Sequence, residues 1–408
     1  MHIVLCADGS RGDLQPMIEL ATALAAAGHD AKLCGPPDFA NAAAARGVAY
    51  ASIGASFRDM LVERAGLIDQ SAYAVIREMV TYLREHLAER VVRLVEHTRG
   101  ADLVVAAGGE LAAASAAECN RVPYRFVVYC PAMLPSREHA PAFVPWQGLP
   151  APINRVLWPL VIGPISFAAG RVLAPARRSL GLPARRNWFR HVLGERPLLA
   201  ADPLLARVPA DVPFRVDQTA ALHPWQDEPL PPKLTSFLAA GAPPVYVGFG
   251  SMPDAKPDAT THLIVEAVAR AGCRAVISAG WAELGGGALP EGVFVTGSVP
   301  HAALFARCAA VVHHGGAGTT TTAARAGVPQ VVVPHVVDQF YWARRVHALG
   351  IAPPHIPRPK LTASALAESL EAVIGNELLA DRALDLGRRL SLDLASARPV
   401  DALLPPVG

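Results

Sequence analysis

The feature that most constrains the fold is an apolar run that leads through a glycine-rich turn into a helical stretch. Residues 309–312 are apolar, His313 and His314 follow, and three glycines then occur within four positions before hydroxyl and helix-forming residues. A strand, a turn and a helix in this order place unpaired N–H groups and the positive end of a helix dipole beside glycines that let an anion approach. The turn can bind phosphate, or it can be an ordinary connection in an α/β protein.

The same order of elements recurs and predicts an α/β fold with parallel sheets. Residues 2–7 are typical of a strand, 8–13 of a polar glycine turn, and 14–27 of a helix with apolar residues at helical spacing. Further strands are expected at residues 31–34, 102–107, 124–129, 245–250, 274–278, 293–296 and 330–333. Further helices are expected at residues 38–46, 74–97, 111–119, 261–271, 301–307, 338–349, 364–374 and 378–390.

A change in pattern divides the chain into two doubly wound halves. Prolines recur between residues 197 and 232, and the alternation of strands and helices fades there. We therefore place a linker at 221–234, between domains at 1–220 and 235–376, with a terminal helical segment at 377–408. Because ligands bind beyond the strand carboxyl ends in such folds, the glycine turns of both domains should face one cleft.

The composition excludes several classes of protein. With 408 residues, 52% of them hydrophobic, the chain is long enough for two cores and is not disordered. Lysine and arginine number 37 against 35 acidic residues, so no basic field indicates a nucleic-acid partner. The arginine pairs at 177–178 and 185–186 suit a solvated face, with contact to anionic lipid as the alternative.

Cysteine usage and the apolar segments indicate a cytoplasmic protein. The six cysteines are scattered singly, mostly within apolar runs, which favours buried free thiols in a reducing compartment. The chain opens on a strand and not on a signal peptide. Residues 156–169 form the most apolar later stretch, which contains two prolines and is too short to cross a bilayer. We expect no integral membrane segment.

The glycine turns of the two halves suggest a diphosphate bound between domains. One turn is at residues 9–12, and the other half contributes 250–251 and 314–319. No H-E-x-x-H motif, cysteine cluster or D-x-D pair follows a strand. We therefore expect no metal or cofactor, with the diphosphate charge offset by the helix dipole, N–H groups, hydroxyls and His314.

Two acidic positions each allow a structural and a functional interpretation. Asp13 stands where a helix begins, so it can be an N-cap, or it can be a general base at the edge of the cleft. Asp338 and Gln339 also begin a helix. They can cap it, or they can bind adjacent hydroxyls of a polyol, because an acid and an amide together accept and donate hydrogen bonds.

Trp281 and the paired histidines leave similar choices. Trp281 follows a predicted strand, where it can stack on a nucleotide base or pack in the core. His313 and His314 do not suit a metal pair, because adjacent residues at a strand end point to opposite faces.

Four motifs in order resemble the GT-B nucleotide-sugar glycosyltransferases of family 1, in the bacterial natural-product (glycopeptide, macrolide or polyketide) or sterol-type branch. Residues 9–16 are similar to the family's G-S-R-G-D-x-x-P, and 245–252 to the strand that opens its donor domain. Residues 313–319 are similar to the H-H-G-x-A-G-T donor loop, and 334–339 to the segment that ends in a D-Q pair. Together they span most of the chain.

The resemblance implies a fold, an activity and residue roles. It implies two Rossmann-like domains facing each other across a cleft, the first binding the acceptor and the second the nucleotide sugar, with the final helix crossing back to the first. Asp13 corresponds to the general base of glycopeptide-type relatives, and Asp338 and Gln339 to the pair that holds the sugar. The donor diphosphate would contact Ser10, Ser251, His314, Gly316, Gly318 and Thr319, and the base would meet Ser298 and Val299, with Trp281 as a further base contact.

The sequence departs from the family pattern in three places. No histidine stands near the first turn, where plant members have their base, which leaves Asp13. Gly316 replaces a serine common in the glycopeptide relatives. Residues 338–342 read D-Q-F-Y-W and are more aromatic than the D-Q-P-Y-F of those relatives. The identity of the acceptor and that of the sugar are therefore not inferred from those relatives.

The reaction implied is inverting and needs no metal, with a UDP- or TDP-sugar as donor. The acceptor is expected to be hydrophobic, a natural-product aglycone or sterol, because residues 131–173 hold the apolar side chains Phe143, Trp146, Trp158 and Phe167, which can otherwise be core. We predict Phe143 and Trp146 as acceptor contacts in a monomer or homodimer.

Other functions remain open at this point. A nucleotide-sugar epimerase and a lipid-intermediate N-acetylglucosaminyltransferase share the implied fold. A non-catalytic accessory protein of a partner transferase would not need Asp13, His314 and the Asp338–Gln339 pair together. A NAD-dependent dehydrogenase is disfavoured, because the G-x-G-x-x-G fingerprint is missing, and no Walker A lysine follows the glycines.

Overall fold

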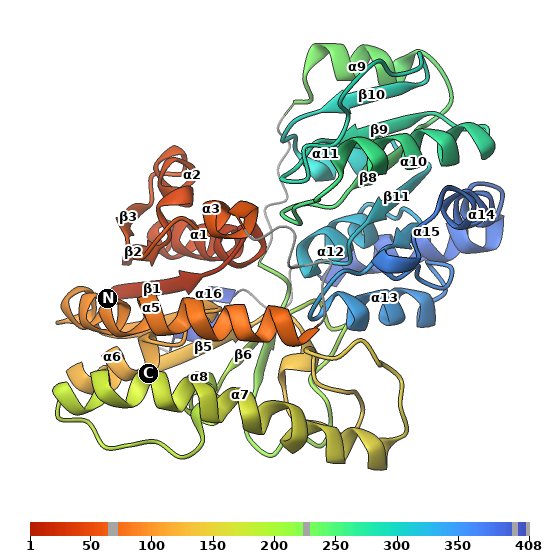
Figure 1. The fold of residues 1–408 in the computed structure, drawn as a ribbon. Coiled ribbons are helices and arrows are strands. Elements are labelled where there is room, and N and C mark those ends of the chain that lie inside the picture. Colours follow the sequence, from red (N-terminus) through yellow and green to blue (C-terminus); the bar gives the residue numbers. More distant parts are fainter. Residues whose placement is uncertain (64–71, 223–228, 394–398, 405–408) are drawn as a thin grey trace.

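A computed structural model of the chain describes residues 1–63, 72–222, 229–393 and 399–404. It has two lobes, each built on a parallel sheet covered by helices (Figure 1). The first sheet has the order β3-β2-β1-β4-β5-β6-β7. Its strands are β1 His2–Asp8, β2 Asp30–Gly35, β3 Ala49–Ser52, β4 Leu103–Gly108, β5 Tyr124–Val128, β6 Leu198–Ala200 and β7 Asp217–Thr219.

The second sheet has the order β10-β9-β8-β11-β12 and is also parallel. Its strands are β8 Val245–Gly248, β9 Ala275–Ser278, β10 Val293–Thr296, β11 Ala310–His313 and β12 Gln330–Val332. The central strands are short continuous apolar runs because helices cover both faces of such a sheet. The predicted α/β class, with two doubly wound units, is confirmed.

Helices lie in most of the connections between successive strands, as is usual for parallel pairing, but the fully described connections from β6 to β7 and from β9 to β10 contain no helix. The first lobe has α1 Arg11–Ala26, α2 Ala40–Ala45, α3 Phe57–Glu63, α5 Ala72–Thr98, α6 Ala113–Asn120, α7 Ala151–Ser179 and α8 Trp188–Leu193, with 3₁₀ turns η1 Pro37–Phe39 and η2 Pro131–Met133. The second lobe has α9 Pro232–Ala239, α10 Pro257–Arg270, α11 His301–Phe305, α12 Ala317–Arg325, α13 Gln339–Ala348, α14 Ala363–Ile374 and α15 Glu377–Asp393, with the 3₁₀ turn η3 Arg358–Lys360; the short α16 Pro399–Leu403 comes last.

The proline-rich region between 197 and 232 is more regular than the sequence predicts. Strands β6 and β7 pair with each other in register from Leu198 opposite Asp217 to Ala200 opposite Thr219, and they extend the first sheet. Strand β3 and helix α8 are also additions to the predicted elements. Of the predicted linker at 221–234, residues 223–228 lie outside the described residues, and the last three belong to α9.

The length prediction for the apolar segment at 156–169 is wrong. It lies inside α7, which continues for 29 residues and is long and apolar enough to cross a membrane, by length and composition alone. Pro159, Pro164 and Pro175 do not end the helix. Each of the three is exposed, so the carbonyl groups that lose a helical partner are not trapped in the core.

The two lobes pack against each other through α12, α13 and α15 of the second lobe. One hydrophobic core contains first-lobe residues together with Trp342, Val346 and Leu390 from α13 and α15. Asp202, after β6, receives two hydrogen bonds from Arg325 at the end of α12, at 2.8 and 3.1 Å, and both side chains are almost fully buried. Helix α15 packs on α12, and α16 returns to the first lobe against α1, β6 and β7 (Figure 1).

Candidate functional site

The glycine turns lie where the direction of strand order reverses in each sheet. In the first sheet β1 pairs with β2 on one side and with β4 on the other, and the turn at residues 9–12 follows β1. In the second sheet β8 and β11 are the corresponding neighbours, and they are followed by residues 249–252 and 314–316. Loops diverge at such switch points and leave room for a ligand.

Asp13 lies in the first turn of α1 and is not its N-cap. Ser10 is the N-cap, and its hydroxyl accepts a hydrogen bond from the N–H of Gly12 at 3.3 Å. Asp13 is the third helical residue, and its Oδ2 accepts from the N–H of Ser10 at 2.9 Å, which completes a capping box. The capping alternative is therefore wrong in its position. The second oxygen of Asp13 is left for another partner.

Two glycines lie against the carboxyl group of Asp13, and a tyrosine bonds its backbone. A Cβ atom at Gly9 would lie 2.3 Å from Asp13 Oδ2, and one at Gly108 would lie 2.7 Å from Oδ1. Both glycines have positive φ, at 133° and 66°. The hydroxyl of Tyr129 donates to the backbone carbonyl of Asp13 at 3.2 Å. Gly108 and Tyr129 were not among the predicted site residues. The one sequence feature that could have indicated Gly108 is the glycine pair that follows a buried strand.

Surrounding protein atoms raise the pKa of Asp13 to about 7. Loss of hydration is the main cause, the hydrogen bond from the N–H of Ser10 opposes it, and the negative charge of Asp338 adds to it. The side chain still keeps part of its surface open to solvent. A carboxyl group with a pKa near neutrality, beside an open cleft, is suited to accept a proton in the working pH range.

Two neighbouring acids share this environment. Burial raises the pKa of Asp338 to about 6, and it also raises that of Asp8 to about 6 against the opposing charge of Arg90. Arg90 is itself buried, and its Nε donates to Glu110 at 2.7 Å. This buried network of Asp8, Arg90 and Glu110 stabilises the carboxyl end of β1. Its residues were not among the predicted site residues.

His313 has a structural role, because it holds the glycine turn at residues 314–316 by hydrogen bonding. It is fully buried, and its Nδ1 accepts from the N–H of Gly315 at 3.0 Å. The proton of the neutral ring is therefore on Nε2, which lies 2.8 Å from Oε1 of Gln330. Burial lowers the pKa of His313 to about 3.

Within the described residues, no cluster of three or more possible metal ligands occurs.

His314 lies in a space that two glycines keep open. A Cβ atom at Gly250 would lie 2.8 Å from its Cε1, and one at Gly316 would lie 2.5 Å from its Nε2. A side chain at either position would therefore displace the ring of His314. Its Nδ1 is buried without a hydrogen-bond partner among the described residues. Such an atom has lost water without compensation and is available to a ligand.

His314 offers a hydrogen bond and not a charge. Burial lowers its pKa to about 4, so the ring is neutral at pH 7. The predicted contact of His314 with a diphosphate stays a prediction, and a neutral ring could contribute to it by hydrogen bonding only. The positive end of α12 remains as the local electrostatic attraction for an anion.

The predicted diphosphate residues Gly316, Gly318 and Thr319 are at the amino-terminal end of α12. Gly316 is the N-cap, which provides no side-chain hydrogen bond, and Thr320 makes the first helical hydrogen bond back to Gly316 at 2.9 Å. Gly318 and Thr319 are half-buried. The N–H groups of this first turn are thus left for a ligand or water.

The Asp338–Gln339 pair follows a strained turn. Val337 has φ 53°, a left-handed conformation that costs a β-branched residue roughly 1–2 kcal/mol. Gln339 Oε1 accepts from the N–H groups of His335 and Val336, at 2.7 and 3.0 Å, which holds this turn. Asp338 makes no capping bond and instead accepts from Trp342 Nε1 at 3.2 Å. Asp338 is therefore the N-cap residue of α13 by position, without a capping hydrogen bond from its side chain.

Two of the three predicted base contacts, Ser298 and Trp281, touch the first lobe. Ser298 is exposed, and its Oγ accepts from Arg11 Nη1 of the first lobe at 2.9 Å. Val299 is buried in the second lobe. Trp281 is half-buried and packs against the apolar cluster of the first lobe. Ser251 is half-buried in the turn after β8. None of these placements tests the predicted contacts with a base or diphosphate.

The predicted acceptor residues are in the loop before α7. Phe143 is half-buried, and Trp146 has 61% of its surface exposed. Trp158 is core, and its Nε1 donates to the carbonyl of His139 at 3.1 Å. Phe167 is 66% exposed on α7. The four aromatic side chains therefore do not form one cluster.

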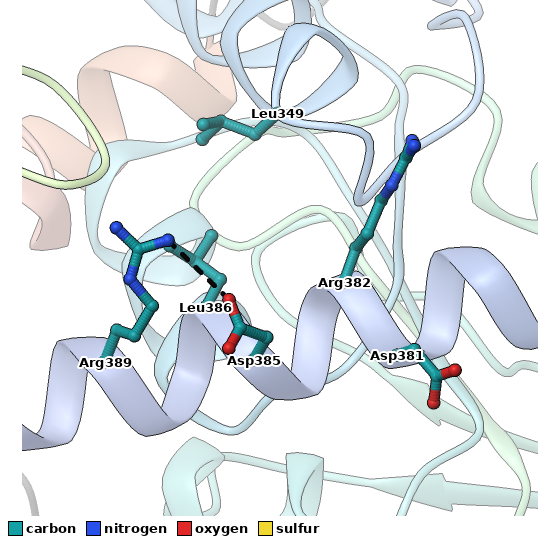
Figure 2. Close-up of a pocket in the computed structure, with 6 residues that line it drawn as sticks. All are labelled: Leu349, Asp381, Arg382, Asp385, Leu386 and Arg389. Atoms are coloured by element: carbon teal, nitrogen blue, oxygen red, sulfur yellow. Dashed lines mark ion pairs between the residues drawn. The ribbon is translucent and has the colours of Figure 1, made fainter.

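One of two pockets in the structure includes residues of this site, and the other does not. A cavity of about 20 Å³ lies between the lobes, and its lining includes Gly12 and Tyr129 from one side and Ala317, Gly318 and Thr321 from the other. A surface pocket of about 420 Å³ lies along α15 and contains none of the predicted site residues (Figure 2). Its lining is Leu349, Asp381, Arg382, Asp385, Leu386 and Arg389. Its charges are mixed, and Arg389 pairs with Asp385 at 3.6 Å.

Comparison with known proteins agrees with this geometry. Residues 3–136 match the glycosyltransferase family 28 N-terminal domain, and residues 264–399 match the erythromycin biosynthesis protein CIII-like, C-terminal domain. The vancomycin aglycone glucosyltransferase of Amycolatopsis orientalis is 36% identical, with 91% of this chain and 90% of that protein covered. The dTDP-epi-vancosaminyltransferase of the same organism is 35% identical, with coverage of 93% and 91%.

A solved structure shows the same fold. The glycosyltransferase VinC, crystallised in complex with dTDP, superposes with a TM-score of 0.69 at 23% identity over 96% of each chain. Two doubly wound lobes with glycine turns at both switch points define a GT-B glycosyltransferase. The chain belongs to family 1 of these enzymes, with the glycopeptide and macrolide natural-product glycosyltransferases.

Proposed function

We propose that this glycosyltransferase moves a sugar from a TDP- or UDP-sugar to a hydroxyl group of a hydrophobic small molecule, with inversion at the anomeric carbon. The observation that carries the proposal is the carboxyl group of Asp13, with its pKa raised to about 7, on the lobe that faces the uncapped end of α12. Residues from both segments, Gly12 and Gly318, line the same small cavity. The donor and acceptor named for the two curated relatives support the substrate classes.

In the proposed step, Asp13 accepts the proton of the acceptor hydroxyl through its free oxygen. The acceptor oxygen forms a bond to the anomeric carbon while the bond from that carbon to the diphosphate oxygen breaks. The electron pair leaves with the diphosphate, which moves toward α12. A single displacement of this kind inverts the anomeric centre and balances the proton and the charge.

We assign the leaving diphosphate to α12 and His314, without a metal ion. The helix end supplies partial positive charge and N–H groups, and the neutral imidazole of His314 supplies one hydrogen bond through a nitrogen that now lacks a partner. By analogy with an oxyanion-hole donor, loss of one such contact should lower the rate by roughly 10²–10³.

The test compares wild type with Asp13→Asn, which keeps the size of the side chain and the hydrogen bond from Ser10. We expect the variant to bind dTDP or UDP as wild type does, by calorimetry, while single-turnover transfer falls by roughly 10²–10⁴ for loss of a general base. A thermal-shift screen of nucleotide sugars identifies the donor first, because a ligand stabilises by RT ln(1 + [L]/Kd). Normal transfer by Asp13→Asn with intact donor binding would reject the assignment.

A further inference from the structure

Helix α7 presents a row of exposed apolar side chains along one face. Ile153, Val156, Leu160 and Phe167 have 47%, 57%, 64% and 66% of their surfaces exposed. Their spacings of three, four and seven residues place them on one side of a helix with 3.6 residues per turn. Single exposed apolar residues are ordinary, but an aligned row is typical of an interaction surface.

The opposite face holds α7 in the first lobe. Trp158 and Leu173 are core residues, and Arg177 is fully buried, with its Nη1 2.9 Å from Oε2 of Glu118. The helix lies along the outer edge of the first lobe (Figure 1). Because pulling out Arg177 would break a buried ion pair, α7 is fixed as a surface helix.

The charged residues of α7 and of the segment that follows it in the sequence are all arginines. Between residues 151 and 194 the sequence has seven arginines and no acidic residue. Arg171 and Arg178 continue the apolar face at helical spacing and are exposed, and the guanidinium of Arg171 lies 5.7 Å from the ring centre of Phe167. Within the described residues neither of these two arginines forms an ion pair. This composition is complementary to a negatively charged surface.

We propose that the exposed face of α7 docks on an anionic lipid bilayer. A helix in this position would insert its apolar row at the boundary between headgroups and acyl chains, with its arginines at the level of the phosphates. The row is a single ridge and not a groove, which suits a soft planar surface. The inference rests on α7 alone and does not depend on the proposed sugar transfer.

The experiment measures flotation of the full chain with vesicles of phosphatidylcholine alone, or with about 30% phosphatidylglycerol added. Wild type should bind the anionic vesicles and lose binding at high salt. Val156→Glu/Leu160→Glu should abolish binding, and Arg171→Glu/Arg178→Glu should weaken it by on the order of tenfold or more. Leu378→Glu/Leu392→Glu is the matched control, because these leucines are equally exposed on α15 (61% and 80%).

Several outcomes would overturn the proposal. Failure of wild type to float with anionic vesicles is one, and loss of binding by the α15 control as complete as that of the α7 variants is another. A dimer in size-exclusion chromatography that Val156→Glu/Leu160→Glu dissociates, without vesicle binding, would assign the face to a second copy. Melting temperatures check that all variants fold. Asp13→Asn should float as wild type does, which separates this proposal from the catalytic one.

Discussion

Gly108 tests whether the position of Asp13 determines the rate. A methyl group added there would meet Asp13 Cβ and Oδ1 at 2.7 Å, and the carbonyl oxygen of Asp8 at the same distance. Carbon–carbon contacts relax to about 3.5 Å or more, so the carboxyl group must move by roughly 0.8 Å. The carbonyl of Asp8 ends a buried strand and cannot move away, so residue 108 must shift as well, and its methyl group crowds the side chain of Asp13.

A displacement of about 1 Å at a reacting group can cost roughly 10² in rate. Gly108→Ala should therefore lower single-turnover transfer by on the order of 10², while dTDP or UDP binding at α12 stays as in wild type. The alanine also carries a backbone cost of roughly 1–2 kcal/mol, because φ is 66°. The loss of rate must be separated from this loss of stability.

Gly100→Ala is the matched control. Gly100 has φ 74° in the same lobe, and an added Cβ would meet nothing within 4 Å. Both variants should lose stability in thermal melts, and Gly108→Ala should lose more, because its added Cβ also meets a backbone carbonyl. Only Gly108→Ala should lose transfer when both variants are assayed below their melting ranges. Equal transfer rates in the two variants would refute the view that crowding around Asp13 sets its catalytic position.

Two further predictions concern charge. Because the fold raises the pKa of Asp13 to about 7, the rate of sugar transfer should rise with pH up to about 7 and then level off. The protonated form of Asp13 contributes stability to the fold, and this stability should be lost as pH rises through about 7. Asp13→Asn should therefore melt higher than wild type at pH 8 and not at pH 4; a constant difference would contradict this. Arg325→Met leaves Asp202 buried and unpaired, and should cost about 3–5 kcal/mol. The double variant with Asp202→Leu should recover most of the melting temperature, and additive losses would show that the pair is not coupled.

The sequence was sufficient for the β–turn–α units. Apolar runs such as β8, which begins where predicted and is buried throughout, can be recognised because a parallel strand buries both faces and needs consecutive apolar residues. Glycine turns after β1 and β8 are legible because Gly9 and Gly250 have positive φ, at 133° and 63°. The short strands β6 and β7 were missed, because three residues carry no pattern of their own and pair only through register with a neighbour.

The length of α7 also exceeded what local rules allow. Proline usually ends a helix, but tertiary packing of Trp158, Leu173 and Arg177 holds the helical turns on both sides of the exposed prolines. The sequence recorded the apolar residues and the arginines. Their alignment on one exposed face appears only once the buried face is known.

For the candidate site, the sequence by itself determined which chemical groups stand at strand ends: Asp13, His314 and the Asp338–Gln339 pair. Only the tertiary structure decided their properties. Burial makes Asp13 titrate near neutrality and keeps His314 uncharged, because desolvation depends on atoms brought from every neighbouring segment. Gly108 stands 95 positions from Asp13 in the numbering, and Arg325 meets Asp202 across a separation of 123. Contacts over such distances leave no local signal, since they arise from the order of strands and the packing of one lobe on the other.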